Sequence, residues 1–412
     1  MQLKNKLAYL LLGALLLPML ANPVAAQDLD ALEDIEDEMQ DLRELDLSDP
    51  LDITFMTRDE FIESLESDSD EEQASESGGA YQQVLVAFGF IEDDQDPDEI
   101  YSGLIGEQVA GYYDPETNEM VVILSGEGDE PSVFDLVTFA HETVHAIQDQ
   151  NFDLNSYDEI RLEGTQDTYL SVTALIEGDA TLALLDYLLA NPDVAADYLA
   201  AVNDDSFESG ALDSAPGFFV ATLAFPYNQG FEFVQVLHEE GGWDLVNDAY
   251  DNPPTTSEQI LHPGKYFDGE EAIDVEVPDI EAALGDGWQV ADSDTFGEFV
   301  ISVLLEDAGL NERQIERAHS GWGGDAYVAA TNNDEVAVTW ATAWDSADDA
   351  DEFFRALVVR ESGRIDGDAE QDGDTVTIRG NDAVVQVILD GETVTWLYGP
   401  DLDAVEVMAG SL

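Results

Sequence analysis

The chain has 412 residues, of which 93 are acidic and 12 basic, so its formal net charge is −81 at pH 7. With no basic patch to neutralise phosphates, this charge argues against nucleic acid and against an anionic membrane surface as partners. The hydrophobic content of 44% is that of a globular protein and not of a disordered chain. A normal core under an acidic surface predicts adaptation to high salt; calcium loading and cation binding are the alternative explanations.

The first 26 residues have the pattern of a signal peptide. Lys4 and Lys6 form a positive n-region, residues 7–20 an apolar h-region, and residues 24–26 a small-residue cleavage site. There is no twin arginine, no cysteine and no later run of 18 apolar residues. We therefore expect export by the general secretory route, with no lipid anchor, membrane span or disulfide. Loss of the two leader lysines would take the net charge from −81 to −83.

The segment after the leader is acidic and weakly amphipathic. Over residues 27–54 we favour an acidic linker over a solvated helix. Residues 55–65 and 80–91 predict helices. Between them, residues 67–79 are rich in Ser, Glu, Asp and Gly, which is the composition of a disordered segment.

The central part of the chain predicts two strands followed by two helices. Residues 109–113 and 120–124 alternate as strands do, with a turn at 114–118. A helix is expected from about Ser132 to Gln150, because Ser132 and Asp135 resemble a capping box before an apolar-periodic run. Residues 165–189 predict the second helix.

The first of these helices contains an HExxH motif formed by His141, Glu142 and His145. Residues i and i+4 lie on one face of a helix, so both imidazoles can reach one metal ion. Glu142 is then placed to take a proton from a metal-bound water. The motif predicts zinc-dependent hydrolysis, most often of peptide bonds. The alternative is a buried amphipathic helix whose two histidines are satisfied by ordinary hydrogen bonds.

A catalytic zinc needs a third protein ligand and an open position. Because cysteine is absent, this ligand must be His, Asp or Glu. Glu163 lies 18 residues after His145, in a turn-like Glu-Gly sequence. Glu177 lies 32 residues after His145, within the second helix and beside small residues that would let this helix approach the HExxH helix closely. We favour Glu177.

These residues resemble the gluzincin branch of the zincin metallopeptidases. From about residue 55 to about residue 325, the chain is also similar to a group of exported, largely uncharacterised HExxH proteins. The stretches that carry this similarity are residues 108–114, 140–150, 177–181, 226–227 and 256–266. One position departs from the thermolysin-like pattern, since Thr181 stands where an Asp follows the ligand glutamate by four residues. Asp179 and Asp149 are the candidates to replace that Asp beside a ligand.

The resemblance implies a zincin-like α+β core over residues 55–270, with an active-site helix, an edge strand and a second helix that carries Glu177. It implies one zinc ion per chain and a peptide or protein substrate. It further implies that the strand at 120–124 borders the cleft and pairs with an extended peptide.

The resemblance also implies donors that stabilise the tetrahedral oxyanion. The candidates are His262 and Tyr266, or Tyr227 in place of Tyr266. An ordinary capping or core role is the alternative for His262. His238 and His319 are expected near helix C-termini, where the helix dipole favours them.

Two basic residues near the motif region are also candidates for function. Arg161 and Lys265 could bind a substrate carboxylate, but we favour the neutralisation of nearby acids for both.

The C-terminal part of the chain has a different pattern. Residues 271–324 predict a helical connector. From about residue 325 the sequence predicts an α+β lobe, as a lobe of one domain or as a separate module. Its expected elements are strands at 335–344, 375–379, 383–389 and 393–398, with a helix at 348–358.

The sequence thus predicts an exported, salt-adapted zinc metallopeptidase of α+β fold. The rival from another class is a non-catalytic zincin-like binding or cell-surface protein.

Overall fold

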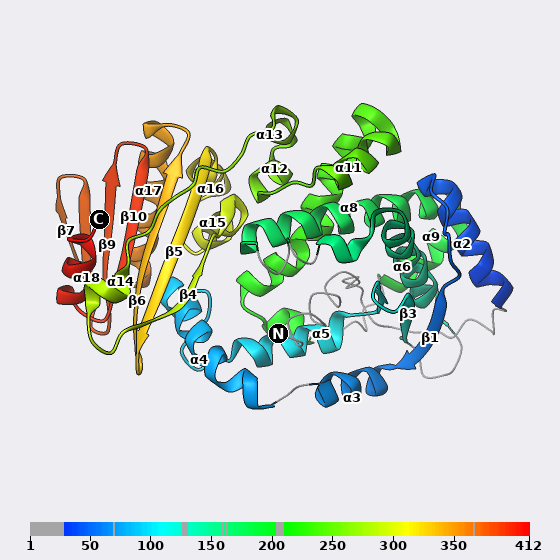
Figure 1. The fold of residues 1–412 in the computed structure, drawn as a ribbon, viewed down its shortest axis with the longest axis horizontal. Coiled ribbons are helices and arrows are strands. Elements are labelled where there is room, and N and C mark those ends of the chain that lie inside the picture. Colours follow the sequence, from blue (N-terminus) through cyan, green and yellow to red (C-terminus); the bar gives the residue numbers. More distant parts are fainter. Residues whose placement is uncertain are drawn as a thin grey trace.

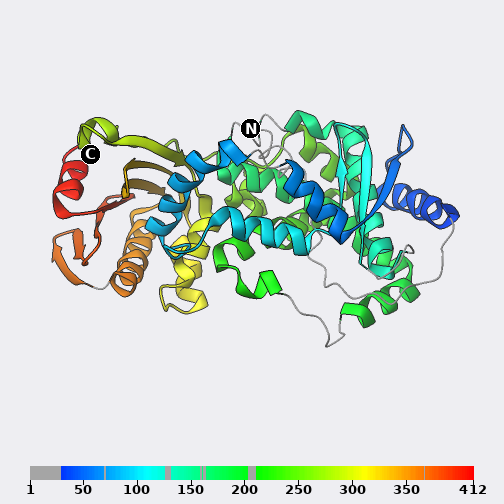
Figure 2. The ribbon, with the colours of Figure 1, turned by 90° about the horizontal axis from the view of Figure 1, so that it is seen from below.

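The computed structural model describes residues 29–68, 71–125, 131–157, 160, 164–202, 210–365 and 367–412. The predicted signal peptide, Arg161 and Glu163 lie outside the described residues. The molecule is elongated: helices and a small sheet form one end, and a larger antiparallel sheet forms the other (Figures 1 and 2).

The fold class is mixed α+β, as the sequence predicts. The helices are α2 (Leu29–Arg43), α3 (Arg58–Asp68), α4 (Glu71–Phe88), α5 (Pro97–Gln108), α6 (Val133–Phe152), the 3₁₀ helix η1 (Leu154–Tyr157), α8 (Gln166–Ala190), α9 (Pro192–Val202), α10 (Gly210–Ser214), α11 (Gly217–Asp251), α12 (Ser257–Leu261), α13 (Pro263–Asp268), α14 (Ile280–Leu284), α15 (Gly297–Glu306), α16 (Glu312–His319), α17 (Ala347–Arg364) and α18 (Leu402–Ala409). The strands are β1 (Asp52–Thr57), β2 (Gly111–Asp114), β3 (Glu119–Leu124), β4 (Gln289–Asp294), β5 (Trp322–Asn332), β6 (Glu335–Trp344), β7 (Asp368–Asp372), β8 (Thr375–Arg379), β9 (Val384–Asp390) and β10 (Thr393–Gly399).

No helix among the described residues is both long enough and apolar enough to cross a membrane.

The N-terminal segment forms a helix that packs on the core. Leu32, Ile35 and Met39 of α2 lie on one face at helical spacing and are buried against α6 and α8. The prediction of a linker over residues 27–54 is therefore wrong. Disorder was also expected over residues 67–79, but residues 71–79 of this run belong to α4.

The small sheet has the strand order β1-β3-β2. β3 pairs with β1 in parallel and with β2 in antiparallel orientation. Asn118, with φ of 58°, closes the predicted turn between β2 and β3. Because β3 has a neighbour on both sides, it cannot accept a further strand, and the expectation that residues 120–124 pair with a peptide is wrong. Both β2 and β3 contact α6, and β2 lies at one edge of the sheet.

The two predicted central helices are confirmed, as is the predicted capping box of the first. Ser132 and Asp135 form the capping box of α6, and the side chain of Thr165 caps α8. We expected the small residues of α8 to face α6, but Ala174 and Gly178 lie against α11, although α8 also packs on α6. A Cβ on Gly178 would collide with the carbonyl of Gly230 in α11, so the two backbones are in direct contact there.

The larger sheet is antiparallel, in the order β4-β5-β6-β10-β9-β8-β7. The strands expected at 335–344, 375–379, 383–389 and 393–398 correspond to β6, β8, β9 and β10, and the helix expected at 348–358 lies within α17. The segment 271–324 is more than a helical connector, because its β4 pairs with β5 and begins the sheet.

The two ends of the molecule share one hydrophobic core. The ring of Phe88, at the end of α4, lies 4.7 Å from Phe296, 5.7 Å from Trp340 and 4.8 Å from Trp396, measured between centroids. These rings come from α4, from the residue preceding α15, and from strands β6 and β10. The C-terminal sheet is thereby packed onto the helical region through buried aromatic contacts.

Candidate metal centre

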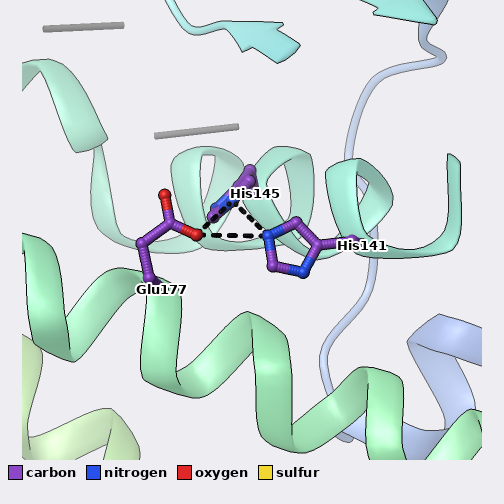
Figure 3. Close-up of side chains that lie close together, drawn as sticks. All are labelled: His141, His145 and Glu177. Carbon is purple, nitrogen blue, oxygen red and sulfur yellow. Dashed lines mark hydrogen bonds and ion pairs between the residues drawn. The ribbon is translucent and has the colours of Figure 1, made fainter. Parts of the chain in front are cut away.

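Three buried side chains converge between α6 and α8, and Figure 3 shows them facing one another. His141 and His145 come from α6 and Glu177 from α8, and none is more than 1% exposed. The Nε2 atoms of the two histidines are 3.1 Å apart. Oε2 of Glu177 lies 3.2 Å from Nε2 of His141 and 3.4 Å from Nε2 of His145. The structure thus brings together the three residues that the sequence predicts as ligands.

These separations fit a single tetrahedral zinc ion. Zinc–nitrogen and zinc–oxygen bonds of about 2.0–2.1 Å at tetrahedral angles place neighbouring donor atoms about 3.3–3.4 Å apart. The three observed separations of 3.1–3.4 Å lie close to this value. Two imidazoles and one carboxylate are also a donor set that zinc accepts in catalytic sites. The residues present therefore fit the ion that the motif predicts.

Gln148 holds one ligand and ties the two helices together. Its Oε1 lies 2.8 Å from Nδ1 of His145, which directs Nε2 of that ring toward Glu177. Its Nε2 donates to the backbone carbonyl of Ile176, which precedes Glu177. The side chain is fully buried. The sequence reasoning did not single out Gln148, although its position one turn after His145 places it on the same helical face.

The two aspartates proposed for this orienting role have other partners. Asp149 accepts hydrogen bonds from Tyr113 Oη and from the backbone N–H of Leu154. Asp179 is bound to Arg43 and to the hydroxyl of Tyr250. The prediction that Asp149 or Asp179 orients a ligand is wrong, because the side chain of Asp179 is held against α2 and α11 and that of Asp149 lies next to β2 and η1.

Glu142 is the second buried carboxylate of the site. It is 0% exposed, and neither of its oxygens has a partner of good hydrogen-bond geometry. Burial raises the pKa of Glu142 well above its ordinary value; the charge of His145 and a backbone interaction with Tyr113 lower it, and Glu177 raises it further. Gly111 of β2 faces this residue, since a Cβ there would lie 3.6 Å from Cγ of Glu142 and 2.7 Å from the methyl group of Thr138. The carboxylate thus sits beside the small sheet.

The two histidines have different electrostatic surroundings. Burial lowers the pKa of His141, against a smaller opposing effect of Glu177. Burial also acts to lower the pKa of His145, but Glu177, Glu142 and Gln148 together raise it to about 9. Two carboxylates around two imidazoles make this pocket favourable for a cation.

Of the three predicted oxyanion donors, the structure brings one to the site. Tyr227 of α11 lies with its ring centroid 6.2 Å from that of His141. Burial raises the pKa of its hydroxyl well above the ordinary value, and Glu177 and Glu142 raise it further, Glu177 also through a hydrogen bond. Tyr227 is therefore the phenol next to the three ligands.

The other two candidates are engaged elsewhere. Nε2 of His262 lies 3.0 Å from Oε1 of Glu298, and the same oxygen lies 2.8 Å from Nδ1 of His319. The hydroxyl of Tyr266 donates to the backbone carbonyl of Asn252. The assignment of His262 and Tyr266 to the oxyanion is thus replaced by Tyr227, the alternative that the sequence left open.

A second group of acids surrounds a lysine. Nζ of Lys265 lies 2.6 Å from Glu258, 2.7 Å from Glu270 and 2.9 Å from Asp345. The ammonium group occupies the centre of this cluster, in agreement with the neutralising role favoured for Lys265.

Comparison with known proteins reaches the C-terminal sheet and not the metal centre. Residues 287–409 match a family model described as a domain of unknown function (DUF8575). This range begins just before β4 and ends at the close of α18, so the matched domain is the seven-stranded sheet with its helices. The search of curated proteins and the search of solved structures found no match.

Proposed function

We propose that this chain is a zinc-dependent metallopeptidase of gluzincin type, with a zincin-like core, that is exported and works in high salt. One observation carries the proposal: three buried donor atoms at zinc-compatible separations lie beside a buried glutamate of the same motif, Glu142, whose oxygens have no good partner. A purely structural pair of histidines gives no reason to bury a second carboxylate at this cost. His141, His145 and Glu177 would hold the ion.

The residues around the site have separate tasks in this reaction. A zinc ion held by the three ligands would supply Lewis acidity toward the scissile carbonyl and the attacking water. Glu142 accepts a proton from the attacking water and delivers it to the leaving amine, for which a raised pKa is suitable. Tyr227 donates its hydroxyl proton in a hydrogen bond to the oxygen that becomes negative in the tetrahedral species.

The substrate backbone would pair with β2. This strand contacts β3 on one side, and the described residues place no strand on its other side. Its Gly111 faces Glu142, so a peptide added at this edge would run past the general base. The proposal therefore transfers the edge-strand role from residues 120–124 to β2.

The rival function is a zincin-like binding protein without turnover. Both functions predict bound zinc, so metal content alone does not separate them. The buried carboxylate of Glu142, whose oxygens have no partner of good hydrogen-bond geometry, favours the enzyme, because a binding protein has no use for a buried proton acceptor.

The test combines metal analysis with hydrolysis of an unbiased peptide library in high salt. The wild-type chain should bind one zinc ion and cleave peptides. Glu142→Gln should keep the zinc and lose about 10²- to 10⁴-fold in rate, because it retains the shape but not the proton acceptor. Glu177→Ala should lose stoichiometric zinc, whereas Glu163→Ala, the other glutamate considered, should keep it. Stoichiometric zinc without any cleavage would favour the binding protein.

A further inference from the structure

A small cavity lies between α8 and α11, with contributions from α4 and α5. Its volume is about 150 Å³. The rings of Tyr81, Tyr101, Tyr169, Phe218 and Phe219 form much of its wall. Among the lining residues, Tyr81 is the one with a largely exposed side chain, at 38%. The described residues that line it include no charged side chain.

The cavity and the metal centre are adjacent along two helices. Thr173 lines the cavity and precedes the ligand Glu177 by four residues, so the two side chains share one face of α8, about 6 Å apart along its axis. On α11, Pro226 lines the cavity and the next residue is Tyr227, which faces the ligands. The cavity therefore lies within about one helical turn of the metal centre along both helices.

Size and chemistry define what the cavity accepts. An apolar cavity of about 150 Å³ in a protein interior holds a benzene-sized molecule. A charged side chain placed there would lose its hydration with no ionic partner, which is strongly unfavourable. An aromatic wall of this size therefore selects a neutral side chain with one six-membered ring, or an aliphatic side chain of similar volume.

We propose that this cavity is the specificity pocket of the enzyme and binds a phenylalanine-sized side chain of the peptide substrate. An extended peptide advances about 3.3 Å per residue. A cavity about 6 Å along α8 from Glu177 thus receives a side chain within two residues of the scissile bond. This inference rests on the proposed function for the identity of the substrate, but the pocket itself binds a ring without catalysis.

The first test variant places a larger side chain at a residue that lines the cavity. Thr222 lines it, is only partly buried and donates its hydroxyl within its own helix, to the carbonyl of Phe218. Thr222→Phe would place a ring in the cavity. Val220→Phe is the matched control, because it adds a similar ring on the same helix at a residue that does not line the cavity. Phe219→Leu is a second variant, which enlarges the cavity and keeps it apolar.

Binding is measured first, on the full zinc-loaded chain in high salt, by calorimetry or saturation-transfer NMR. N-acetyl-phenylalanine amide should bind at least about tenfold more tightly than N-acetyl-alanine amide. Thr222→Phe should abolish this preference and Val220→Phe should keep it. Phe219→Leu should shift the preference toward N-acetyl-tryptophan amide. No preference in the wild type, or a preference unchanged by both cavity variants, would overturn the pocket.

Cleavage is measured second, as the ratio of kcat/KM for two library peptides that differ only in phenylalanine or alanine near the scissile bond. Thr222→Phe should lower this ratio by at least about tenfold. An unchanged ratio in an active, folded variant would contradict the pocket while leaving the peptidase intact. Ring binding that follows the predicted variant pattern, without cleavage of any peptide, would leave the pocket standing and reject the proposed function.

Discussion

At the scale of single residues, Gln148 fixes the orientation of His145, one of the three proposed metal ligands. An imidazole ring can turn about its Cβ–Cγ bond, and Nε2 of His145 faces Glu177 because Oε1 of Gln148 lies 2.8 Å from the opposite nitrogen. The amide of Gln148 is fixed in turn by its bond to the carbonyl of Ile176. Partners of this kind keep a ligand ring in one orientation and raise its basicity toward a metal.

Replacing Gln148 with Leu should weaken zinc binding by about 10- to 100-fold, because Leu has a similar volume but no acceptor for Nδ1 of His145. Zinc affinity can be measured by competition with a chelator at fixed pH and salt. Gln150→Leu on the same helix is the control, since Gln150 binds the backbone of Ser48 and Asp49 and not a ligand. Equal zinc affinities for the two variants would reject the orienting role.

At the scale of elements, the side chain of Arg43 joins three helices close to the metal centre through a buried ion pair and a further hydrogen bond. Arg43 of α2 makes two bonds to Asp179 of α8, of 2.7 and 3.1 Å, and a third to Asn247 of α11. Tyr250 of α11 donates to the same carboxylate, and the guanidinium lies 4.3 Å from the centroid of the Trp243 ring. Asp179 is two residues from Glu177, so α2 supports the helix that carries the third ligand.

Removal of this arginine should strongly destabilise the fold. Arg43→Met leaves the carboxylate of Asp179 buried without its cation, which typically costs about 3–5 kcal/mol of unfolding free energy. Urea unfolding in high salt measures the loss. Arg355→Met is the control, because Arg355 is 73% exposed and its pair with Asp351 should contribute less than about 1 kcal/mol. The double variant Arg43→Met, Asp179→Leu should recover much of the stability; a double variant no better than Arg43→Met would argue against this explanation.

At the scale of the whole molecule, the excess of acidic residues predicts that stability depends on salt. With 93 acidic and 12 basic residues, like-charge repulsion opposes the compact state when it is unscreened. The Debye length is about 10 Å at 0.1 M salt and about 3 Å at 1 M, so simple repulsion is largely screened within a few tenths molar. A requirement that persists into the molar range would point to cation binding by carboxylates and to salt-strengthened burial of the core.

We predict that the protein loses structure below about 0.1 M salt and regains it in molar NaCl or KCl. Circular dichroism during dialysis and back-titration follows both steps. A thermal transition that stays the same from about 0.05 to 3 M NaCl would count against salt adaptation, and calcium capture would then be the better explanation for the acids.

The buried acids predict how stability changes with pH. Burial raises the pKa of Asp294 to about 6 and that of Glu258 to about 7, despite the opposing effect of Lys265 on the latter. An acid whose pKa is higher in the folded state binds protons on folding, so its contribution to stability is greatest at low pH. That contribution is lost as the pH rises from the unfolded pKa of about 4 through the folded pKa.

The melting temperature of the metal-free protein should therefore fall between about pH 4.5 and pH 7.5 at constant high salt. The metal-free form is used because protonation of histidines would release zinc in the same range. Asp294→Asn should make the decrease smaller, since it removes one of the titrating groups and keeps the oxygen that accepts from Gln166 and Thr295. A melting temperature that rises over this range would contradict the prediction.

The sequence by itself determined the local features of this protein. The HExxH spacing, the capping box at Ser132 and the apolar periodicity established α6 and α8, because these signals act over one or two helical turns. Alternating Val, Thr and Trp residues likewise established β6, β8, β9 and β10 almost to the residue. The choice of Glu177 as third ligand also came from the sequence, and the structure brings it within 3.4 Å of both histidines.

Only the tertiary structure decided which elements meet. The sequence did not predict α2, because the apolar positions Leu32, Ile35 and Met39 form only a weak stripe among many acidic residues. The helix is held in place by the ion pair between its Arg43 and Asp179, which is distant in the sequence. The placement of β3 at the sheet centre and of Tyr227 instead of Tyr266 beside the ligands depends on contacts between separate segments. The bond from Gln148 to the carbonyl of Ile176 is another contact of this kind. Such contacts leave no periodic signal in the chain, so the cavity beside the metal centre could be found only once α8 and α11 were seen packed together.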